Sequence, residues 1–418
     1  MKKLLFAVLS VVACSAAYAQ QWEVSIVDVT TNAIVYDAAT NRIYATIPSG
    51  NGSNGNSIGV INPQTHTLEN TVFVGSDPTV MAITDNGQYI YTGFANSAAI
   101  RKFDVASLTT GALYPLGSDP FHGPYYAADI EAVPGQPDAV AVSRKYLTTM
   151  PEFAGVAIYD NGVMRPNVAT RTNSDINNRI EFQSSGIMFG YNHESTGFDF
   201  NIFSVNANGL TRVANYGNLP GNSFSFYLDF ITNGNFVYFS EGTVLDVSGT
   251  PFVIGQFSGV NGPAAYDAQN NAVCYASNIN GAVTFKRFNA NTFLLNASQG
   301  INNVYGQPKC LITCGPGYYA FNTNDNKVVI LHDTTAGTNG IVKNGISLYP
   351  NPASDFIKIE TGGTDIEKAI VYGMGGNIVF EGKPEENMIN TSNFAAGLYL
   401  VQVTDSNNNI YTKKIVRQ

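Results

Sequence analysis

Charge is the first property that this chain has little of. Charged residues make up only 13% of the 418 residues, and the formal net charge is -9. An acidic chain repels the phosphate backbone of nucleic acids, which argues against DNA or RNA as a partner. Asn, Thr, Ser and Gly must therefore supply most of the surface polarity.

Cysteine and histidine are also scarce, with four of each. Three cysteines follow the N-terminal segment, and an odd number in an exported chain leaves at least one thiol unpaired. On one strand, Cys310 and Cys314 would lie about 13 Å apart, too far for a disulfide unless a turn separates them. The spacing fits no zinc pattern, so we predict no metal site, no cofactor and cysteines that act as small buried side chains.

No apolar run reaches the roughly 20 residues that a transmembrane helix needs. Two lysines precede an apolar stretch over residues 4–12, and a small-x-small cleavage site follows at 17–19. We therefore predict a signal peptide over residues 1–19. An alternative is lipidation of Cys14, which ends a sequence that resembles a lipoprotein box.

After the leader, no stretch has the amphipathic period of a helix. Gly is abundant at 40 residues, and β-branched and aromatic side chains dominate the apolar runs, which favours many short strands. The clearest unit spans residues 79–94, where an apolar run, an Asp-Asn-Gly turn and an alternating aromatic run follow one another. Asn and Gly tolerate the positive φ of tight turns, so this stretch predicts a β-hairpin.

Variants of this hairpin recur along the chain. Short strands group in sets of four with a period of about 40–50 residues, which is typical of β-propeller blades. Tyr36-Asp37-Ala38-x-x-Asn41 returns as Tyr266-Asp267-Ala268-x-x-Asn271, and the strand that opens the fifth set is expected over residues 226–231. The seventh set lacks a fourth strand, which the lone strand over residues 22–29 can supply.

We therefore predict an all-β fold: a seven-bladed β-propeller over residues 20–333, closed by an N-terminal strand. A pair of β-sandwiches is the alternative, but it leaves the period and the lone strand unexplained. The unit from Gly75-Ser76-Asp77-Pro78 to Asp104 resembles the YVTN/YncE-like repeat family of propellers, with its Gly-x-x-Pro start, apolar run, turn and Asn-Ser pair. This resemblance implies a fold more than an activity.

A second module follows a segment over residues 334–345 that is rich in Thr, Gly and Asn and reads as a linker. Residues 346–418 contain seven short apolar runs, which predict a small immunoglobulin-like β-sandwich. Three motifs occur in order: Leu-Tyr-Pro-Asn-Pro-Ala from 348, Gly-Leu-Tyr-x-Val from 397, and Lys-Lys-Ile-Val from 413.

In these motifs the module resembles the type A C-terminal sorting domain of the type IX secretion (Por secretion) system of Bacteroidetes. The matching sorting-signal residues are Tyr349, Pro350, Asn351, Pro352, Gly397, Tyr399, Lys413 and Lys414. The resemblance implies export through the periplasm, the type IX machinery as a partner, and a final location that is secreted or attached to the outer-membrane surface.

Ligands of propellers usually bind at one mouth of the central channel, which loops between and within blades help to build. Titratable and aromatic side chains in such loops are the predicted ligand-binding residues, although each could equally be a solvated loop residue: Asp119, His122, Tyr125, Tyr126, Arg144, Lys145, His193 and Glu194. A Gly-x-Ser-x-Gly match at 55–59 lacks the following helix of a nucleophile elbow, and the sequence names no catalytic residue.

Three functions remain open at this point, because propellers host all of them. The favoured hypothesis is a surface-delivered module that binds a glycan, a peptide or a protein partner. The alternative is a lyase or hydrolase at the channel mouth, which clustered titratable residues at one mouth would favour. The third is a structural component of the cell surface.

Overall fold

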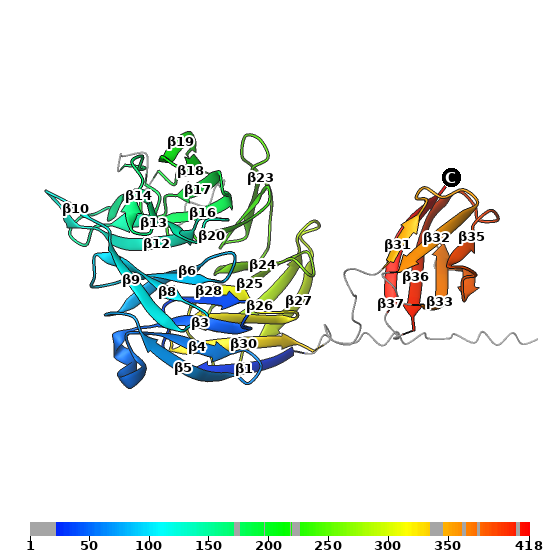
Figure 1. Cartoon of the computed structure of the whole chain (residues 1–418), viewed down its shortest axis with the longest axis horizontal. Helices are drawn as coiled ribbons and strands as arrows, with labels where there is room; N and C mark the ends of the chain where they lie inside the picture. Colours follow the sequence, from blue (N-terminus) through cyan, green and yellow to red (C-terminus); the bar gives the residue numbers. More distant parts are fainter. Residues whose placement is uncertain are drawn as a thin grey trace, which may run out of the picture. The chain divides into compact units, whose positions relative to one another are not determined.

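The computed structural model describes residues 22–170, 176–195, 197–217, 219, 226–334, 346–361, 365–373, 377–406 and 410–418. The chain divides into two compact units, the first ending at His332 and the second beginning at Asp333, and each is described by itself. Strands dominate both units, beside a 3-10 turn η1 (Ser49–Asn54) (Figure 1). Within the described ranges, no helix is long and apolar enough to span a membrane.

The described part of the first unit forms seven four-stranded sheets in chain order. The first sheet consists of β2 (Ile34–Asp37), β3 (Arg42–Ile47), β4 (Ser57–Asn62) and β5 (Thr67–Phe73), and the second of β6 (Pro78–Ile83), β7 (Tyr89–Phe94), β8 (Ala99–Asp104) and β9 (Thr109–Pro115). The third sheet consists of β12 (Tyr126–Ala132), β13 (Ala139–Lys145), β14 (Phe153–Asp160) and β15 (Val163–Met164), and the fourth of β16 (Arg179–Ser184), β17 (Ile187–Tyr191), β18 (Phe200–Asn206) and β19 (Gly209–Tyr216).

The remaining three sheets complete the unit, and a small hairpin interrupts the connection between the second and third sheets. The fifth sheet consists of β20 (Phe230–Asn233), β21 (Phe236–Phe239), β22 (Thr243–Asp246) and β23 (Phe252–Gln256), and the sixth of β24 (Ala264–Asp267), β25 (Ala272–Ile279), β26 (Ala282–Asn289) and β27 (Leu295–Gly300). The seventh consists of β28 (Pro308–Thr313), β29 (Tyr318–Thr323), β30 (Lys327–Asp333) and β1 (Trp22–Asp28). The small hairpin pairs β10 (Ser118–Asp119) with β11 (Gly123–Pro124).

The N-terminal strand β1 lies beside β30 as the fourth strand of the last sheet, as the sequence predicted (Figure 1). Trp22 packs its ring against Phe285 and Tyr319, with centroid distances of 5.2 and 5.9 Å. Lys327 and Asp28 form an ion pair, with Nζ of Lys327 2.7 Å from Oδ1 of Asp28. Both ends of the first unit are therefore tied into one sheet.

The first strands of the sheets contact one another in the order β2, β6, β12, β16, β20, β24 and β28, and β28 contacts β2 again. The same seven strands line one cavity. The sheets are therefore arranged around a common axis in a propeller-like, all-β fold.

The alternating strand directions create two different ends. Connections between successive sheets share one end with the loops between second and third strands, and we call this the connection end. Hairpins between first and second strands, and between third and fourth, lie at the other, which we call the hairpin end. Hydrogen bonds agree: Thr148 donates to the carbonyl of His122 at the connection end (3.0 Å), and the amide of Gly135 donates to Asp85 at the hairpin end (2.8 Å).

The recurring Tyr-Asp-Ala-x-x-Asn motif is a structural turn at the hairpin end. In both copies the aspartate accepts backbone N–H groups of the turn, and the tyrosine hydroxyl donates to the asparagine, at 2.9 Å from Tyr36 to Asn41 and 2.7 Å from Tyr266 to Asn271. Both asparagines have positive φ, 52° and 46°. Asn tolerates this conformation and Asp hydrogen-bonds its own turn, which explains why these residue types repeat.

Aromatic side chains fill the space within and between the sheets. Each of the seven sheets contributes one fully buried tyrosine: Tyr44, Tyr91, Tyr159, Tyr191, Tyr238, Tyr275 and Tyr319. Buried hydroxyls need partners, and Tyr91 and Tyr159 donate to the carbonyls of Pro137 and Leu116. The three described cysteines are unpaired, as their number and spacing predicted for at least one of them.

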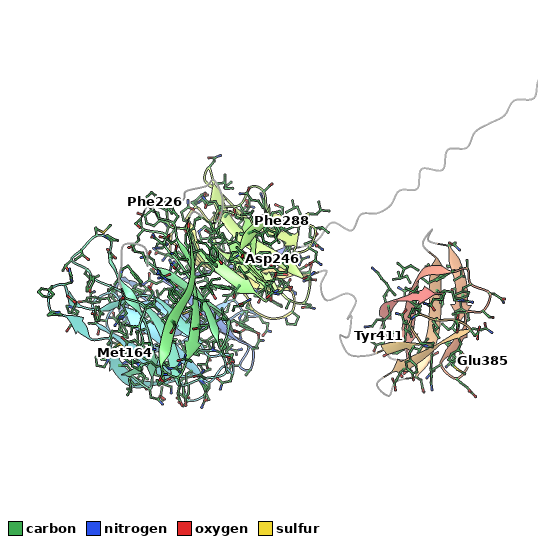
Figure 2. All side chains as sticks on the ribbon, turned by 90° about the horizontal axis from the view of Figure 1, so that it is seen from above. Met164, Phe226, Asp246, Phe288, Glu385 and Tyr411 are labelled. Atoms are coloured by element: carbon green, nitrogen blue, oxygen red, sulfur yellow. The ribbon has the colours of Figure 1, made fainter. Side chains whose placement is uncertain are left out.

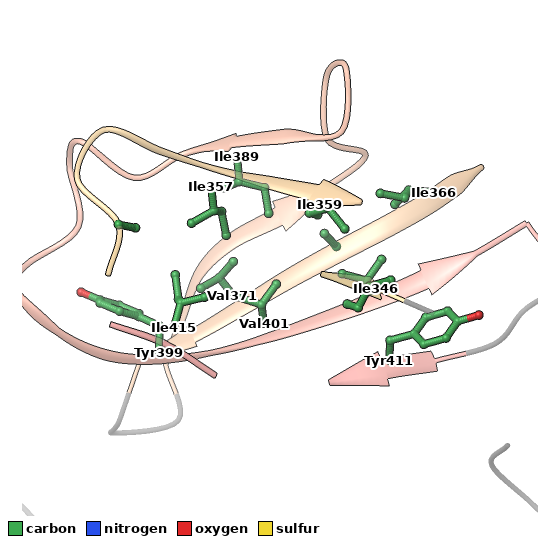
Figure 3. Close-up of a cluster of buried hydrophobic side chains, with 13 residues drawn as sticks. Ile346, Ile357, Ile359, Ile366, Val371, Ile389, Tyr399, Val401, Tyr411 and Ile415 are labelled. Carbon is green, nitrogen blue, oxygen red and sulfur yellow. The ribbon is translucent and has the colours of Figure 1, made fainter. Parts of the chain in front are cut away.

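The second unit has two antiparallel sheets around one apolar core (Figure 3). Ile357 and Ile359 of one sheet face the other sheet, which contributes Val371, Val401 and Ile415. All five side chains are buried. The strands are β31 (Ile346–Tyr349), β32 (Phe356–Thr361) and β35 (Met388–Asn390) in one sheet, and β34 (Ile378–Gly382), β33 (Ile366–Gly373), β36 (Gly397–Asp405) and β37 (Ile410–Arg417) in the other.

Candidate functional site

The central cavity of the first unit is the larger of two cavities that bear on function, with a volume of about 690 Å³. Side chains alternate in direction along a strand, so residues two apart share a face. Asp129 and Glu131 on β12, and Arg179 and Glu181 on β16, accordingly line the cavity in pairs, together with Asp229 just before β20.

Arg179 lies between two carboxylates. Its Nη1 is 3.6 Å from Oδ1 of Asp129, and its Nε is 3.6 Å from Oδ1 of Asp229. Each carboxylate is also held by backbone: Asp129 accepts the amide of Ile180 at 2.9 Å, and Asp229 accepts the amide of Phe230 at 3.0 Å. Three neighbouring sheets therefore fix one charged cluster.

Burial sets the protonation of this cluster. It raises the pKa of Asp129 to about 6, against the lowering effect of Arg179. Burial also raises the pKa of Glu131 and Glu181 well above the usual range, and neighbouring carboxylates add to both shifts. The carboxylates outnumber the cations, because besides Arg179 only Lys309 lines the cavity with a positive charge. The raised pKa values favour the uncharged forms of Glu131 and Glu181, and a positively charged group nearby would stabilise their charged forms.

The second cavity, of about 530 Å³, is lined by the connection between the second and third sheets, by the third sheet and by the segment that follows it. Nδ1 of His122 is 2.8 Å from Oδ1 of Asp119. The guanidinium of Arg144 lies over the ring of Tyr125 at 4.4 Å, and Tyr146 contacts both His122 and Tyr125, with centroid distances of 4.9 and 5.5 Å.

The structure brings four of the eight predicted ligand-binding residues together in this second cavity: Asp119, His122, Tyr125 and Arg144. The other four lie elsewhere. Tyr126 begins β12 opposite Lys145 of β13, and Lys145 forms a 3.4 Å ion pair with Glu152.

His193 and Glu194 lie in the loop between β17 and β18 and line neither cavity. Nδ1 of His193 is 3.2 Å from the carbonyl of Leu228, and the ring contacts Tyr227. Burial, and then the positive charge of Arg179, lower the pKa of His193 to about 4, whereas burial raises the pKa of Glu194. His193 is therefore neutral at pH 7.

Sequence reasoning missed the charged residues of the central cavity, because it considered loops rather than first strands. Asp129, Arg179 and Asp229 stand 50 positions apart in the chain, close to the repeat period, and each lies within a first strand or directly before one. That spacing was a usable signal. Among the described residues, no group of three or more His, Cys, Asp or Glu side chains is arranged to hold a metal ion.

Large apolar side chains are exposed on the loops of the connection end. Phe121, Tyr227 and Tyr305 are 88%, 82% and 72% exposed, and they belong to three different connections between sheets. Exposed aromatic side chains on the loops of one end are typical of a binding surface.

Several of the predicted sorting-signal residues of the second unit lie on or close to its last strand. Asn351 donates to the carbonyl of Lys414 and accepts the amide of Val416, at 3.2 and 2.9 Å. Tyr399 is buried and donates to the carbonyl of Ala395. Lys413 and Lys414 are exposed, as is Tyr349, so the surface of this unit presents parts of the start and the end of the motif together.

These features define a protein with a propeller-like unit and a second, smaller β-rich unit. Residues 347–418 match the family of secretion system C-terminal sorting domains. Domains of this family mark proteins that type IX secretion exports, so the chain is delivered to the cell surface or to the outside.

Two curated relatives are similar over short stretches. The endo-acting ulvan lyase of Formosa agariphila is 33% identical over 103 residues, which is 23% of this chain and 20% of that protein. The ulvan lyase NLR42 of Nonlabens ulvanivorans is 28% identical over 142 residues, 33% of this chain and 24% of that protein. The chain spans a quarter or less of these relatives, and neither match is long enough to cover the first unit.

A solved structure resembles the fold. A chain of Kuenenia stuttgartiensis hydrazine synthase has a TM-score of 0.54 at 12% identity, covering 76% of this chain and 98% of that one. At this identity the likeness concerns the fold alone.

Proposed function

We propose that this protein is a seven-bladed β-propeller, related to the YVTN/YncE-like repeats, that acts outside the cell as a binding module. In this proposal a signal peptide (1–19) is removed, the propeller spans residues 20–333, and a linker (334–345) leads to an immunoglobulin-like sorting domain (346–418). The ligand is a glycan, a peptide or a protein partner. The observation that carries the proposal is the central cavity in which three blades hold Asp129, Arg179 and Asp229 together.

The charge of this cavity favours a ligand that carries positive groups. Four carboxyl groups line the cavity together with one arginine and one lysine, and Lys309 already donates to the carbonyl of Thr31 at 2.8 Å. A basic group on a ligand would pair with Glu131 and Glu181 and favour their charged forms. Among the open partner classes, a basic peptide segment fits best.

A thermal-shift experiment on the purified full-length chain tests this proposal. Lysine- and arginine-containing peptides should raise the melting temperature through mass action, and neutral peptides of the same length should not. The variant Asp229→Asn should reduce the shift. Its control is Asp246→Asn, at the end of the third strand β22 and labelled in Figure 2, which lines neither cavity and should leave the shift unchanged. Equal shifts with neutral peptides, or none with basic ones, would contradict the proposal.

An enzymatic function, a lyase or hydrolase of the propeller type, is the second candidate. It is supported by the carboxyl group of Asp129, whose pKa of about 6 suits general acid–base catalysis, beside a carboxylate held by Arg179. The names of the two partial relatives point to polysaccharide cleavage. Incubation with polysaccharides should then release new reducing or unsaturated ends, and Asp129→Asn should abolish their release.

The sorting domain gives a separate prediction about export. Deletion of residues 346–418 should leave the propeller in the periplasm, because the type IX machinery would no longer recognise it. Fractionation and surface proteolysis of cells measure this, and continued surface display of the truncated chain would refute the assigned role.

A further inference from the structure

Arg144 is a buried cation that no carboxylate neutralises within the described residues. Only 5% of this residue is exposed. Its Nη2 and Nε donate to the carbonyls of Ala154 and Gly155 at 3.4 and 3.5 Å, and its Nη1 reaches the sulfur of Met164 at 3.6 Å. A thioether is a weak acceptor. The hydroxyl of Tyr159 also interacts with Arg144. These partners are all uncharged, and a buried charge is costly unless it is paired, so an anion would stabilise Arg144.

The second cavity borders the Nη1 edge of Arg144. Arg144, Met164 and Tyr125 all line it, and the ring of Tyr125 covers one face of the guanidinium. At the rim, Asp119 accepts the backbone amides of Phe121 and His122, at 2.8 and 2.9 Å, and these bonds lower its pKa, so it is ionised at neutral pH. One wall of the cavity therefore offers a cation and the rim offers a carboxylate.

We propose that this cavity binds an acidic sugar residue of a glycan, with the oxyanion of the sugar on Arg144. A carboxylate or sulfate group would replace the weak contact between Nη1 and Met164 with a charge-assisted hydrogen bond. Hydroxyl groups of the same sugar would donate to Asp119, and His122 would face them through the ring nitrogen that Asp119 leaves open. An acidic peptide side chain supplies the oxyanion but no hydroxyl donors, so the paired cation and carboxylate favour the sugar.

This site is distinct from the central cavity. The two cavities share no lining residue, and their charged groups differ: acidic residues outnumber basic ones in the central cavity, whereas the second cavity has one of each, Arg144 and Asp119. The two sites can therefore be tested independently with ligands of opposite charge.

The experiment measures binding of a linear uronic acid oligosaccharide to the full-length chain by calorimetry. A sulfated oligosaccharide, a neutral oligosaccharide of equal length and an oligoglutamate peptide are the comparison ligands. We expect the uronic acid oligosaccharide or the sulfated one to bind and the neutral one not to bind. Which of the two acidic oligosaccharides binds identifies the oxyanion as a carboxylate or a sulfate. Equal affinity for oligoglutamate would overturn the assignment to a sugar.

The variant Arg144→Met separates a binding role from a structural one. Replacing a buried unpaired charge by an apolar side chain is often neutral or stabilising, so the melting temperature should stay the same or rise. Affinity for the acidic oligosaccharide should fall about tenfold or more. Unchanged affinity for the acidic oligosaccharide, whether or not the melting temperature falls, would overturn the proposal.

Two further variants keep the test decisive if Arg144→Met does not fold. His122→Gln lies at the half-exposed rim and should weaken binding of the acidic oligosaccharide without changing the melting temperature. Arg179→Gln, in the central cavity, is the matched control and should leave that binding unchanged. Loss of binding in Arg179→Gln with full binding in His122→Gln would place the oligosaccharide in the central cavity and refute the proposal.

Discussion

The two ends of the propeller-like unit are built from the same strands but differ in what their loops do. At the hairpin end, buried aspartates such as Asp37 and Asp267 hold tight turns. At the connection end, the loops leave Phe121, Tyr227 and Tyr305 exposed, and one connection lines the second cavity. The difference suggests that one end stabilises the sheets and the other meets ligands, the usual division between a rigid scaffold and functional loops.

The hairpin end also joins neighbouring sheets. Gly135 donates from the third sheet's hairpin to Asp85 of the second, and Gln183 of the fourth donates to the carbonyl of Gly234 in the fifth. Gly87 lies so close to Asp37 of the first sheet that a Cβ atom would approach Oδ1 to 2.3 Å. These contacts make the turns part of the packing between sheets.

Asp267→Ala should have the largest effect on stability. The buried carboxylate accepts the amides of Gln269 and Asn270, at 3.0 and 3.1 Å, and the hydroxyl of Tyr319 in the next sheet. Leaving these donors unpaired should lower the free energy of unfolding by about 2–4 kcal/mol. Denaturant unfolding measures it. Asp246→Ala is the control at an exposed turn, and an equal loss there would contradict the structural role of Asp267.

His193→Gln tests the connection end through pH. The folded pKa of His193 is lowered to about 4, so the native state resists protonation and stability is lost as pH falls from about 6.5 towards 4. At pH 5 this loss is about 2 kcal/mol for wild type relative to pH 8, an order-of-magnitude value. The variant should lose less stability over this range. If wild type and variant lose the same free energy of unfolding between pH 8 and pH 5, protonation of His193 is not the cause of the loss.

Gly87→Ala should destabilise through contact between sheets. The residue has a φ of +70°, and the added methyl group would collide with Asp37. Gly234→Ala, in the first hairpin of the fifth sheet, is the control, because its φ is +59° but nothing lies within 4 Å of the added atom. Both variants should lose about 1 kcal/mol to backbone strain, and Gly87→Ala should lose more. Equal losses would show that the collision is relieved at no cost.

The sequence predicted the hairpin end better than the connection end, for a physical reason. Turn chemistry is local: Asn271 and Gly87 announce positive φ within a few residues of their strands, and the strands beside them were predicted closely. The connection end depends on distant partners. The strand expected over residues 226–231 was wrong, because Tyr227 has a φ of 66° and donates to the carbonyl of His193, so β20 begins only at Phe230.

The same distinction explains the candidate sites. Residues within one connection, such as Asp119 and His122, could be paired from their spacing alone. The cluster of Asp129, Arg179 and Asp229 joins three sheets, and its members meet only because the first strands surround one cavity. The 50-residue spacing reports equivalence in the repeat, but distances and protonation states follow only from the arrangement of the sheets.

Tyr305→Ser should have the smallest effect on stability and yet alter ligand binding. The ring is 72% exposed, whereas its backbone is held by Asn278 and Asp325 at 2.6 and 3.0 Å. An exposed side chain away from the core contributes within about 0.5 kcal/mol, so the melting temperature should hardly change. The shift produced by basic peptides should become smaller. Leu294→Ser, an equally exposed apolar residue at the hairpin end, is the matched control and should leave that shift intact. If both variants reduce the shift equally, ligand contact is not confined to the connection end, and the division between the two ends is wrong.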